Sequence, residues 1–74
     1  MTVLVLYGTA HCHLCEVAAD ILEKAGVVAG KVDIMDAPDL LERYATRIPV
    51  LYREDGASEL DWPFDGAAVQ NFLR

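Results

Sequence analysis

The sequence predicts an α/β fold of the order β-α-β-α-β-β-α, in which a four-stranded mixed sheet carries helices on both faces. Three observations lead to this prediction: a bulky apolar run at residues 3–7, a helical repeat of apolar residues from Leu14, and a turn signal at residues 54–56. Strands that alternate with helices pair in parallel through right-handed crossovers, whereas a short turn returns a strand antiparallel. We expect residues 1–74 to form a single domain, because so short a chain has no room for a second core.

The first third of the chain predicts a strand, a loop and an amphipathic helix. Residues 3–7 are β-branched or bulky at every position, which is typical of a strand covered from both sides. Residues 8–11 break this pattern and are expected to form a loop. Gly26 suits the C-terminal cap of the helix that follows. The apolar face of that helix, with spacings of three and four residues, is predicted to consist of Leu14, Val17, Ala18, Ile21, Leu22 and Ala25.

The middle of the chain predicts a second strand and a second helix. Residues 31–35 alternate, with Val32 and Ile34 on one side, as in a strand. Asp36 is expected to cap the next helix, and Pro38 is expected in its first turn, where a missing N–H leaves no hydrogen bond unmade. The buried face of this helix is predicted to consist of Leu40, Leu41, Tyr44 and Ala45.

The last third predicts a hairpin and a final helix. A third strand is expected at residues 48–52, and the turn signal Glu-Asp-Gly at residues 54–56 makes residues 57–61 the returning strand. Asp65 is expected to cap the last helix. The apolar face of that helix is predicted to consist of Ala68, Val69, Phe72 and Leu73.

The charge of the chain excludes several functions. Twelve acidic and six basic residues give a net charge of −6, so the chain lacks the basic stripe of a nucleic-acid binder and is repelled by anionic membrane surfaces. The early apolar run is far shorter than the ~20 residues of a membrane-spanning helix. The N-terminus also lacks the basic region and cleavage site of a signal peptide. We therefore expect a cytoplasmic monomer with neither a nucleic-acid nor a membrane partner.

Two cysteines, Cys12 and Cys15, frame the segment Cys-His-Leu-Cys at the start of the first predicted helix. A disulfide between them would close a very short loop and constrain little of the unfolded chain, which argues against a structural role. A helix N-terminus offers unpaired N–H donors and the positive end of the helix dipole, and both favour a thiolate. Since thiols in such settings have pKa values of roughly 3.5–7.5, we expect Cys12 to be largely ionised at neutral pH.

The positions of the two cysteines predict different roles. Cys12 lies at the loop–helix junction, so we expect it to be exposed and to attack the substrate. Cys15 lies beside the apolar helix face, so we expect it to be partly buried and to resolve the mixed disulfide. His11 and His13 flank Cys12 and are expected to favour its thiolate through hydrogen bonds or, when protonated, through their charge. These residues predict a thiol–disulfide oxidoreductase whose substrate is a thiol or disulfide of a protein or a small molecule.

Other interpretations use the same residues. His11, Cys12, His13 and Cys15 are soft or borderline ligands, so a copper- or zinc-binding chaperone domain is the main alternative. Against it, side chains at adjacent positions diverge and do not easily turn toward one ion. An inert structural pair of cysteines is a further alternative, as is an adaptor that holds peptides without redox chemistry.

Three motifs make the whole chain resemble the thioredoxin superfamily, and small glutaredoxin-like bacterial proteins in particular. They are the strand-end segment at residues 6–9, the Cys-His-Leu-Cys segment at residues 12–15, and the segment Arg-Ile-Pro-Val-Leu-Tyr at residues 47–52. The resemblance implies a thioredoxin-like fold, a cis peptide bond before Pro49, and a substrate groove between the Cys12 loop and the Ile48-Pro49 turn. It thereby assigns Ile48 and Pro49, with the two histidines, to substrate binding.

The sequence also departs from typical glutaredoxins. These have proline and tyrosine between the cysteines, where this chain has His13 and Leu14, and a basic residue where it has Thr9. The Gly-Gly pair that helps to hold glutathione is not found in residues 62–66. We expect no bound cofactor, and glutathione is a candidate co-substrate that should bind weakly. Arg47 is the one basic residue expected near the groove.

Overall fold

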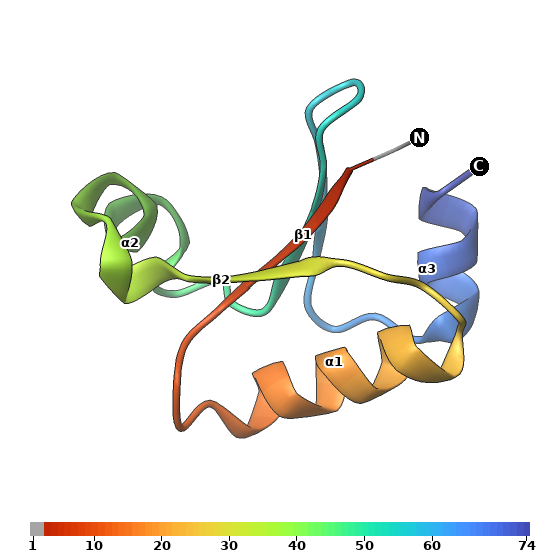
Figure 1. Ribbon diagram of the computed structural model, residues 1–74, viewed down its shortest axis with the longest axis horizontal. Helices are drawn as coiled ribbons and strands as arrows, with labels where there is room; N and C mark the ends of the chain where they lie inside the picture. The colour runs from red at the N-terminus through yellow and green to blue at the C-terminus, as the bar shows by residue number, and fades with distance from the viewer. Residues whose placement is uncertain (1–2) are drawn as a thin grey trace.

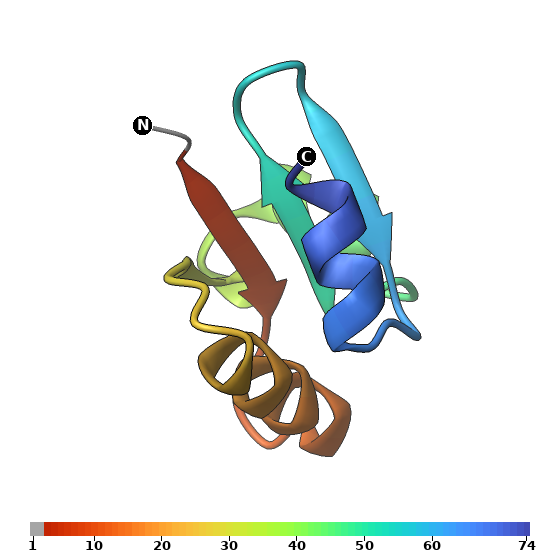
Figure 2. The ribbon, with the colours of Figure 1, turned by 90° about the vertical axis from the view of Figure 1, so that its right-hand side faces the viewer.

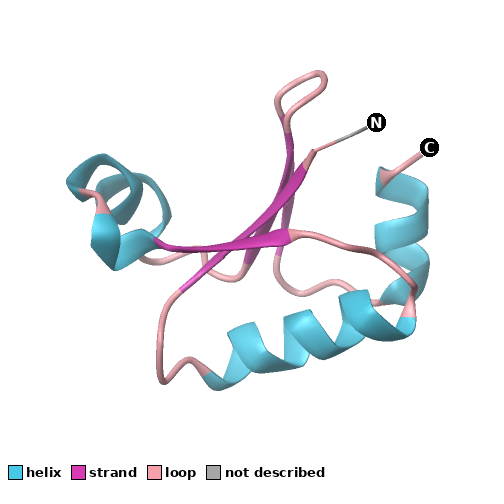
Figure 3. Cartoon of the chain, in the orientation of Figure 1, coloured by secondary structure: helices cyan, strands magenta, loops and turns pink. Residues whose placement is uncertain are grey.

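The structure, a computed structural model, describes residues 3–74 (Figures 1 and 3). Its elements are β1 (Leu4–Gly8), α1 (His13–Lys24), β2 (Gly30–Asp33), the 3₁₀ turn η1 (Ile34–Asp36), α2 (Pro38–Tyr44), β3 (Val50–Arg53), β4 (Ser58–Asp61) and α3 (Gly66–Phe72). This order confirms the predicted succession of strands and helices, with one short turn added.

The four strands form a mixed sheet in the order β2-β1-β3-β4. Strand β1 pairs in parallel with β2 and antiparallel with β3, and β3 pairs antiparallel with β4. In this register Leu6 lies between Lys31 of β2 and Leu51 of β3. The parallel crossover and the final hairpin are therefore as the sequence predicts.

Helices cover both faces of the sheet, as Figure 2 shows, with α1 and α3 on one side and α2 on the other. Alternate residues of β1 and β3 point to opposite faces because a strand has a side-chain period of two. The buried residues on the side of α1 and α3 are Leu4, Leu6, Ala18, Leu22, Leu51, Phe64 and Val69. Those on the side of α2 are Ile34, Tyr44 and Val50.

Helix α1 has well-defined ends. Cys12 is its N-cap residue, in extended conformation, and the Cys12 side chain accepts a hydrogen bond from a backbone N–H of the first turn. At the other end Gly26 has a φ of 73°, and its N–H donates to the Glu23 carbonyl while Val27 N–H donates to the Leu22 carbonyl. These two bonds make a Schellman motif, in which glycine adopts the left-handed conformation at little steric cost. The predicted C-terminal glycine is confirmed.

The segment that follows β2 differs from the prediction. The strand ends at Asp33, and Ile34, expected within the strand, instead begins the 3₁₀ turn η1 and is 2% exposed. The Asp33 carboxylate accepts a hydrogen bond from the Met35 N–H at 2.9 Å and so caps this turn. The expected capping role of Asp36 is wrong, because Ala37 occupies the N-cap position of α2 and makes no side-chain cap.

The C-terminal part follows the prediction closely. Strand β3 begins at Val50 rather than at residue 48, and the turn at residues 54–57 leads back into β4. Asp65 caps α3, accepting a hydrogen bond from the Ala68 N–H at 2.8 Å, as expected. Within residues 3–74, no helix is both long enough and apolar enough to cross a membrane.

Candidate active site

Cys12 and Cys15 form a disulfide at the N-terminus of α1, with their Cα atoms 5.2 Å apart. This Cα separation lies within the range of 4.4–6.8 Å that is usual for disulfides. Cys12 lies at the start of α1, at the end of the loop that follows β1. Cys15 lies three residues further, about one helical turn on, so the two side chains are on the same side of the helix. Local structure therefore places the pair in bonding geometry.

The helix N-terminus is directed at the Cys12 sulfur. The backbone N–H of Cys15 donates a hydrogen bond to Cys12 Sγ at 3.2 Å, the contact by which the side chain caps the helix. Because the first-turn N–H groups have no partner within the helix, they also carry the positive end of the helix dipole. When the disulfide is reduced, the same donor is in place to stabilise a thiolate on Cys12.

Burial distinguishes the two cysteines. Cys15 is buried, at 9% exposure, whereas Cys12 is half-buried. The end of β1 packs directly beneath Cys15, since a Cβ placed on Gly8 would lie only 3.0 Å from Cys15 Sγ. Cys12 is thus the more accessible residue of the two, although it is half-buried rather than exposed as the sequence predicts.

The two histidines lie on the surface beside the disulfide. His11 adopts a φ of 61°, a left-handed conformation unusual for a residue with a side chain, immediately before Cys12. The His13 side chain is 85% exposed, and its Nδ1 lies 3.9 Å from a carboxylate oxygen of Glu16. Both side chains are therefore open to solvent.

A small cavity of about 330 Å³ lies beside the Cys-His-Leu-Cys segment. It is lined by Leu14, Thr46, Arg47, Ile48, Asp61 and Trp62. The Ile48-Pro49 peptide bond is cis, as the resemblance implies, and Pro49 is fully buried while Ile48 is half-buried. The segment between the cysteines and the segment before Pro49 therefore share one depression, which is a candidate substrate groove. A second cis bond, Trp62-Pro63, was not expected from the sequence.

Arg47 lies in this cavity and joins the loop before Pro49 to β4. Its Nη2 donates to Glu59 Oε1 at 2.8 Å and to Asp61 Oδ1 at 2.7 Å, and its guanidinium carbon lies 5.3 Å from the centre of the Tyr44 ring. The Tyr44 hydroxyl donates to Glu59 Oε2. The hydrogen bond from Tyr44, followed by that from Arg47, lowers the pKa of Glu59.

Glu59 is the member of this network that sequence reasoning missed. It lies 12 residues from Arg47 and 15 from Tyr44, so no local spacing signals the contact. The only available signal was the register of the hairpin, which puts Glu59 and Asp61 on the same face of β4.

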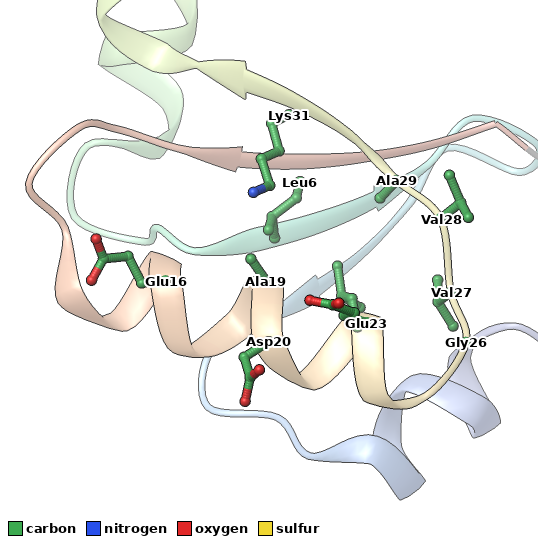
Figure 4. Close-up of a pocket in the computed structure, with 11 residues that line it drawn as sticks. Leu6, Glu16, Ala19, Asp20, Glu23, Gly26, Val27, Val28, Ala29 and Lys31 are labelled. Carbon is green, nitrogen blue, oxygen red and sulfur yellow. The ribbon is translucent and has the colours of Figure 1, made fainter.

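Two further depressions lie next to each other, on the side of α1 opposite to the 330 Å³ cavity. The larger, of about 640 Å³, lies between α1 and β2 (Figure 4), and the Lys31 side chain extends across it from β2 toward α1. The other, of about 430 Å³, reaches Cys15 and Gly8. They share Leu6, Glu16, Ala19 and Lys31 among their lining residues.

The structure does not favour a metal centre. Across residues 3–74, no group of three or more His, Cys, Asp or Glu side chains is arranged to hold a metal ion. The four candidate ligands at residues 11–15 thus do not converge, and the interpretation as a copper or zinc site has no support from the described part of the chain.

Comparison with known proteins extends these findings. The model of the glutaredoxin-like domain family matches residues 3–74. The X-ray structure of protein XcR50 from X. campestris is 38% identical, with a TM-score of 0.86 over 95% of this chain and 93% of that one. The solution structure of protein Ne2328 from Nitrosomonas europaea is 28% identical, with a TM-score of 0.74 over 99% and 92%.

A more distant structure establishes the wider fold. Oxidised thioredoxin from Plasmodium falciparum is 20% identical, with a TM-score of 0.63 over 97% of this chain and 77% of that one, a likeness that shows the fold alone. Among curated proteins, none matches this chain. The family match over nearly the entire chain and the sheet described above lead to one conclusion: the chain belongs to the glutaredoxin-like domain family and has a thioredoxin-like fold.

Proposed function

We propose that this protein is a thiol–disulfide oxidoreductase that works through Cys12 and Cys15. The observation that carries the proposal is the disulfide at the N-terminus of α1, with the Cys15 N–H directed at Cys12 Sγ. A dithiol in such a setting has one sulfur activated for attack and a second within reach to complete the exchange.

The proposed reaction proceeds in two exchanges. The Cys12 thiolate attacks one sulfur of a substrate disulfide, so that the substrate S–S bond breaks, one substrate thiolate leaves, and a mixed disulfide forms. Cys15, deprotonated, then attacks Cys12 Sγ, which releases the second substrate sulfur and forms the Cys12–Cys15 disulfide. Two electrons pass from the protein to the substrate, and the two protons lost by the cysteines end on the substrate thiols.

A thiol or dithiol reductant then returns the protein to its reduced form by the reverse pair of exchanges. We also propose that the protein acts in the cytoplasm, where such reductants keep dithiols reduced. Glutathione is one candidate reductant, although Arg47, the only cation among the described residues that line the groove, already donates to Glu59 and Asp61.

A turnover experiment tests this function. The reduced protein is mixed with a peptide disulfide, and released thiols are counted while intact mass follows the loss of two hydrogens from the protein. We expect stoichiometric reduction by the natural chain, and no release of both thiols by Cys12→Ser or Cys15→Ser. Equal reduction by Cys12→Ser would overturn the proposal.

A further inference from the structure

We infer that the groove beside Cys12 selects disulfides that carry a cationic side chain and an apolar side chain next to the reacting cysteine, with Asp61 accepting the cation. This inference rests on the proposed function and names the substrate class of the same site. Its evidence lies in the walls of the 330 Å³ cavity, in the charges along its rim, and in its position next to the disulfide.

Half of the residues that line the cavity are apolar, and one of them belongs to the segment between the cysteines. Leu14 lies between Cys12 and Cys15 in the chain and is 47% exposed, although leucine is usually buried. Ile48 and Trp62 complete this apolar side, and both are half-buried. An apolar side chain near the substrate cysteine would cover Leu14 and remove this surface from water.

The Trp62 ring is held in place before any substrate arrives. It packs edge-on against Phe64, with ring centres 5.1 Å apart, and Phe64 is itself buried in the core. A ring fixed in this way loses little conformational freedom on binding, which makes it an effective contact surface.

The charges on the rim favour a cation. Arg47 lies between two carboxylates, to each of which its Nη2 donates a hydrogen bond. Asp61 uses only Oδ1 in this contact, and within residues 3–74 its Oδ2 makes no hydrogen bond, while the side chain is 58% exposed. The Asp61 carboxylate therefore keeps an acceptor oxygen without a hydrogen bond from the described residues, on an exposed side chain that lines the cavity and can receive a lysine or arginine side chain.

An anionic substrate has weaker complementarity with the same groove. Another positive side chain, that of Arg43, lies over the Tyr44 ring at 5.9 Å and does not line the cavity. The chain as a whole carries a net charge of −6, which also favours cationic over anionic partners. Charge complementarity in this arrangement raises the association rate of cationic partners and lowers that of anionic ones.

The test compares three disulfide probes on the reduced protein. Two are matched peptides, each with a leucine beside its cysteine, that differ only in a lysine or a glutamate at the next position; the third is oxidised glutathione. The measured quantity is the second-order rate constant for mixed-disulfide formation at low and at high ionic strength. The variants are Asp61→Asn, which keeps shape and removes one charge, and Glu23→Gln as the control.

Glu23 is a suitable control because it is exposed and lies eleven residues beyond Cys12 on α1, about 16 Å along the helix axis. Each substitution removes one negative charge, so any difference between the two variants in the lysine preference is due to where the charge lies. The Asp61→Asn protein keeps the hydrogen bond from Arg47 to Glu59, and this bond should hold the loop before Pro49 in the same position against β4.

We expect the lysine peptide to react faster than the glutamate peptide and glutathione, and the preference to shrink at high salt. Asp61→Asn should lower the preference for the lysine peptide by up to about fivefold, because one exposed ion pair contributes no more than that factor to a rate or affinity. Glu23→Gln should preserve the preference. No preference, or an equal loss in both variants, would overturn the inference while leaving the proposed function intact. No reaction with any probe would overturn both.

Discussion

Cys12 serves the fold and the proposed chemistry with the same atom. Its Sγ accepts the hydrogen bond from the Cys15 N–H that caps α1, and it is also the sulfur expected to attack. Serine is among the preferred N-cap residues, so Cys12→Ser should keep the cap while it removes the thiol. The loss of reactivity in that variant can therefore be separated from loss of structure.

The setting of Cys12 predicts its ionisation. In the Cys15→Ser variant, we expect the Cys12 thiol to titrate with a pKa below ~7.5, since a backbone donor and the helix dipole favour the thiolate. In Cys12→Ser, the buried Cys15 should titrate higher, because burial disfavours the charged form. Thiolate absorbance against pH measures both values. A Cys15 that ionises below Cys12 would reverse the assigned roles.

Glu59 predicts a pH dependence of stability. The hydrogen bonds from Tyr44 and Arg47 place its pKa below the ordinary value of 4.5, so the folded state favours the carboxylate. The stabilisation is therefore present above pH 4.5 and is lost as the pH falls through the lowered pKa. Urea unfolding at pH 7 and pH 3 should show a smaller pH effect for Glu59→Gln than for the natural chain. Glu42→Gln, an exposed change on α2, is the control and should leave the pH effect unchanged.

At the scale of single elements, the cap of α3 gives a direct test. Asp65 accepts a hydrogen bond from the Ala68 N–H, so Asp65→Ala should lower the free energy of unfolding by about 1 kcal/mol. Asp65→Asn, which retains a capping oxygen, should lose much less. Chemical denaturation of the three proteins measures this. Equal stability of all three would contradict the role of the cap.

The elements that the sequence predicts well are those with local signals. The apolar repeat and Gly26 determine α1, and Asp65 determines the start of α3, because caps and periodicity act within a few residues. The boundary after β2 was wrong because Val32 and Ile34 alternate equally well in a strand or at the entry to a tight turn. What ends the strand is the Asp33 side chain, which bonds to the Met35 N–H.

At the scale of the whole molecule, the groove depends on contacts between distant segments. The resemblance to glutaredoxins predicted its position and its cis bond at Ile48-Pro49. The network of Arg47 with Glu59 and Asp61 could not be predicted in the same way, since it forms only when the loop between α2 and β3 meets β4. Residues 12–14 apart in sequence carry no periodic signal of such a contact.

The overall charge predicts how the rate of reduction of oxidised glutathione depends on salt. A chain with a net charge of −6 repels an anionic tripeptide, so reduction of oxidised glutathione should be slow at low salt and faster as salt screens the repulsion. Rate constants at several ionic strengths, with uncharged hydroxyethyl disulfide as the control, measure this effect. A rate with glutathione that falls as salt is added would show an attractive site instead.

The most direct test of the central claim is the capture of the mixed disulfide. Reduced Cys15→Ser is mixed with a peptide disulfide, and intact mass with peptide mapping locates the adduct. Since nothing remains to resolve the intermediate, we expect one peptide per protein to accumulate on Cys12, while Cys12→Ser reacts far more slowly at the buried Cys15. The absence of an adduct on Cys12, or faster capture by Cys15 in Cys12→Ser, would contradict the account.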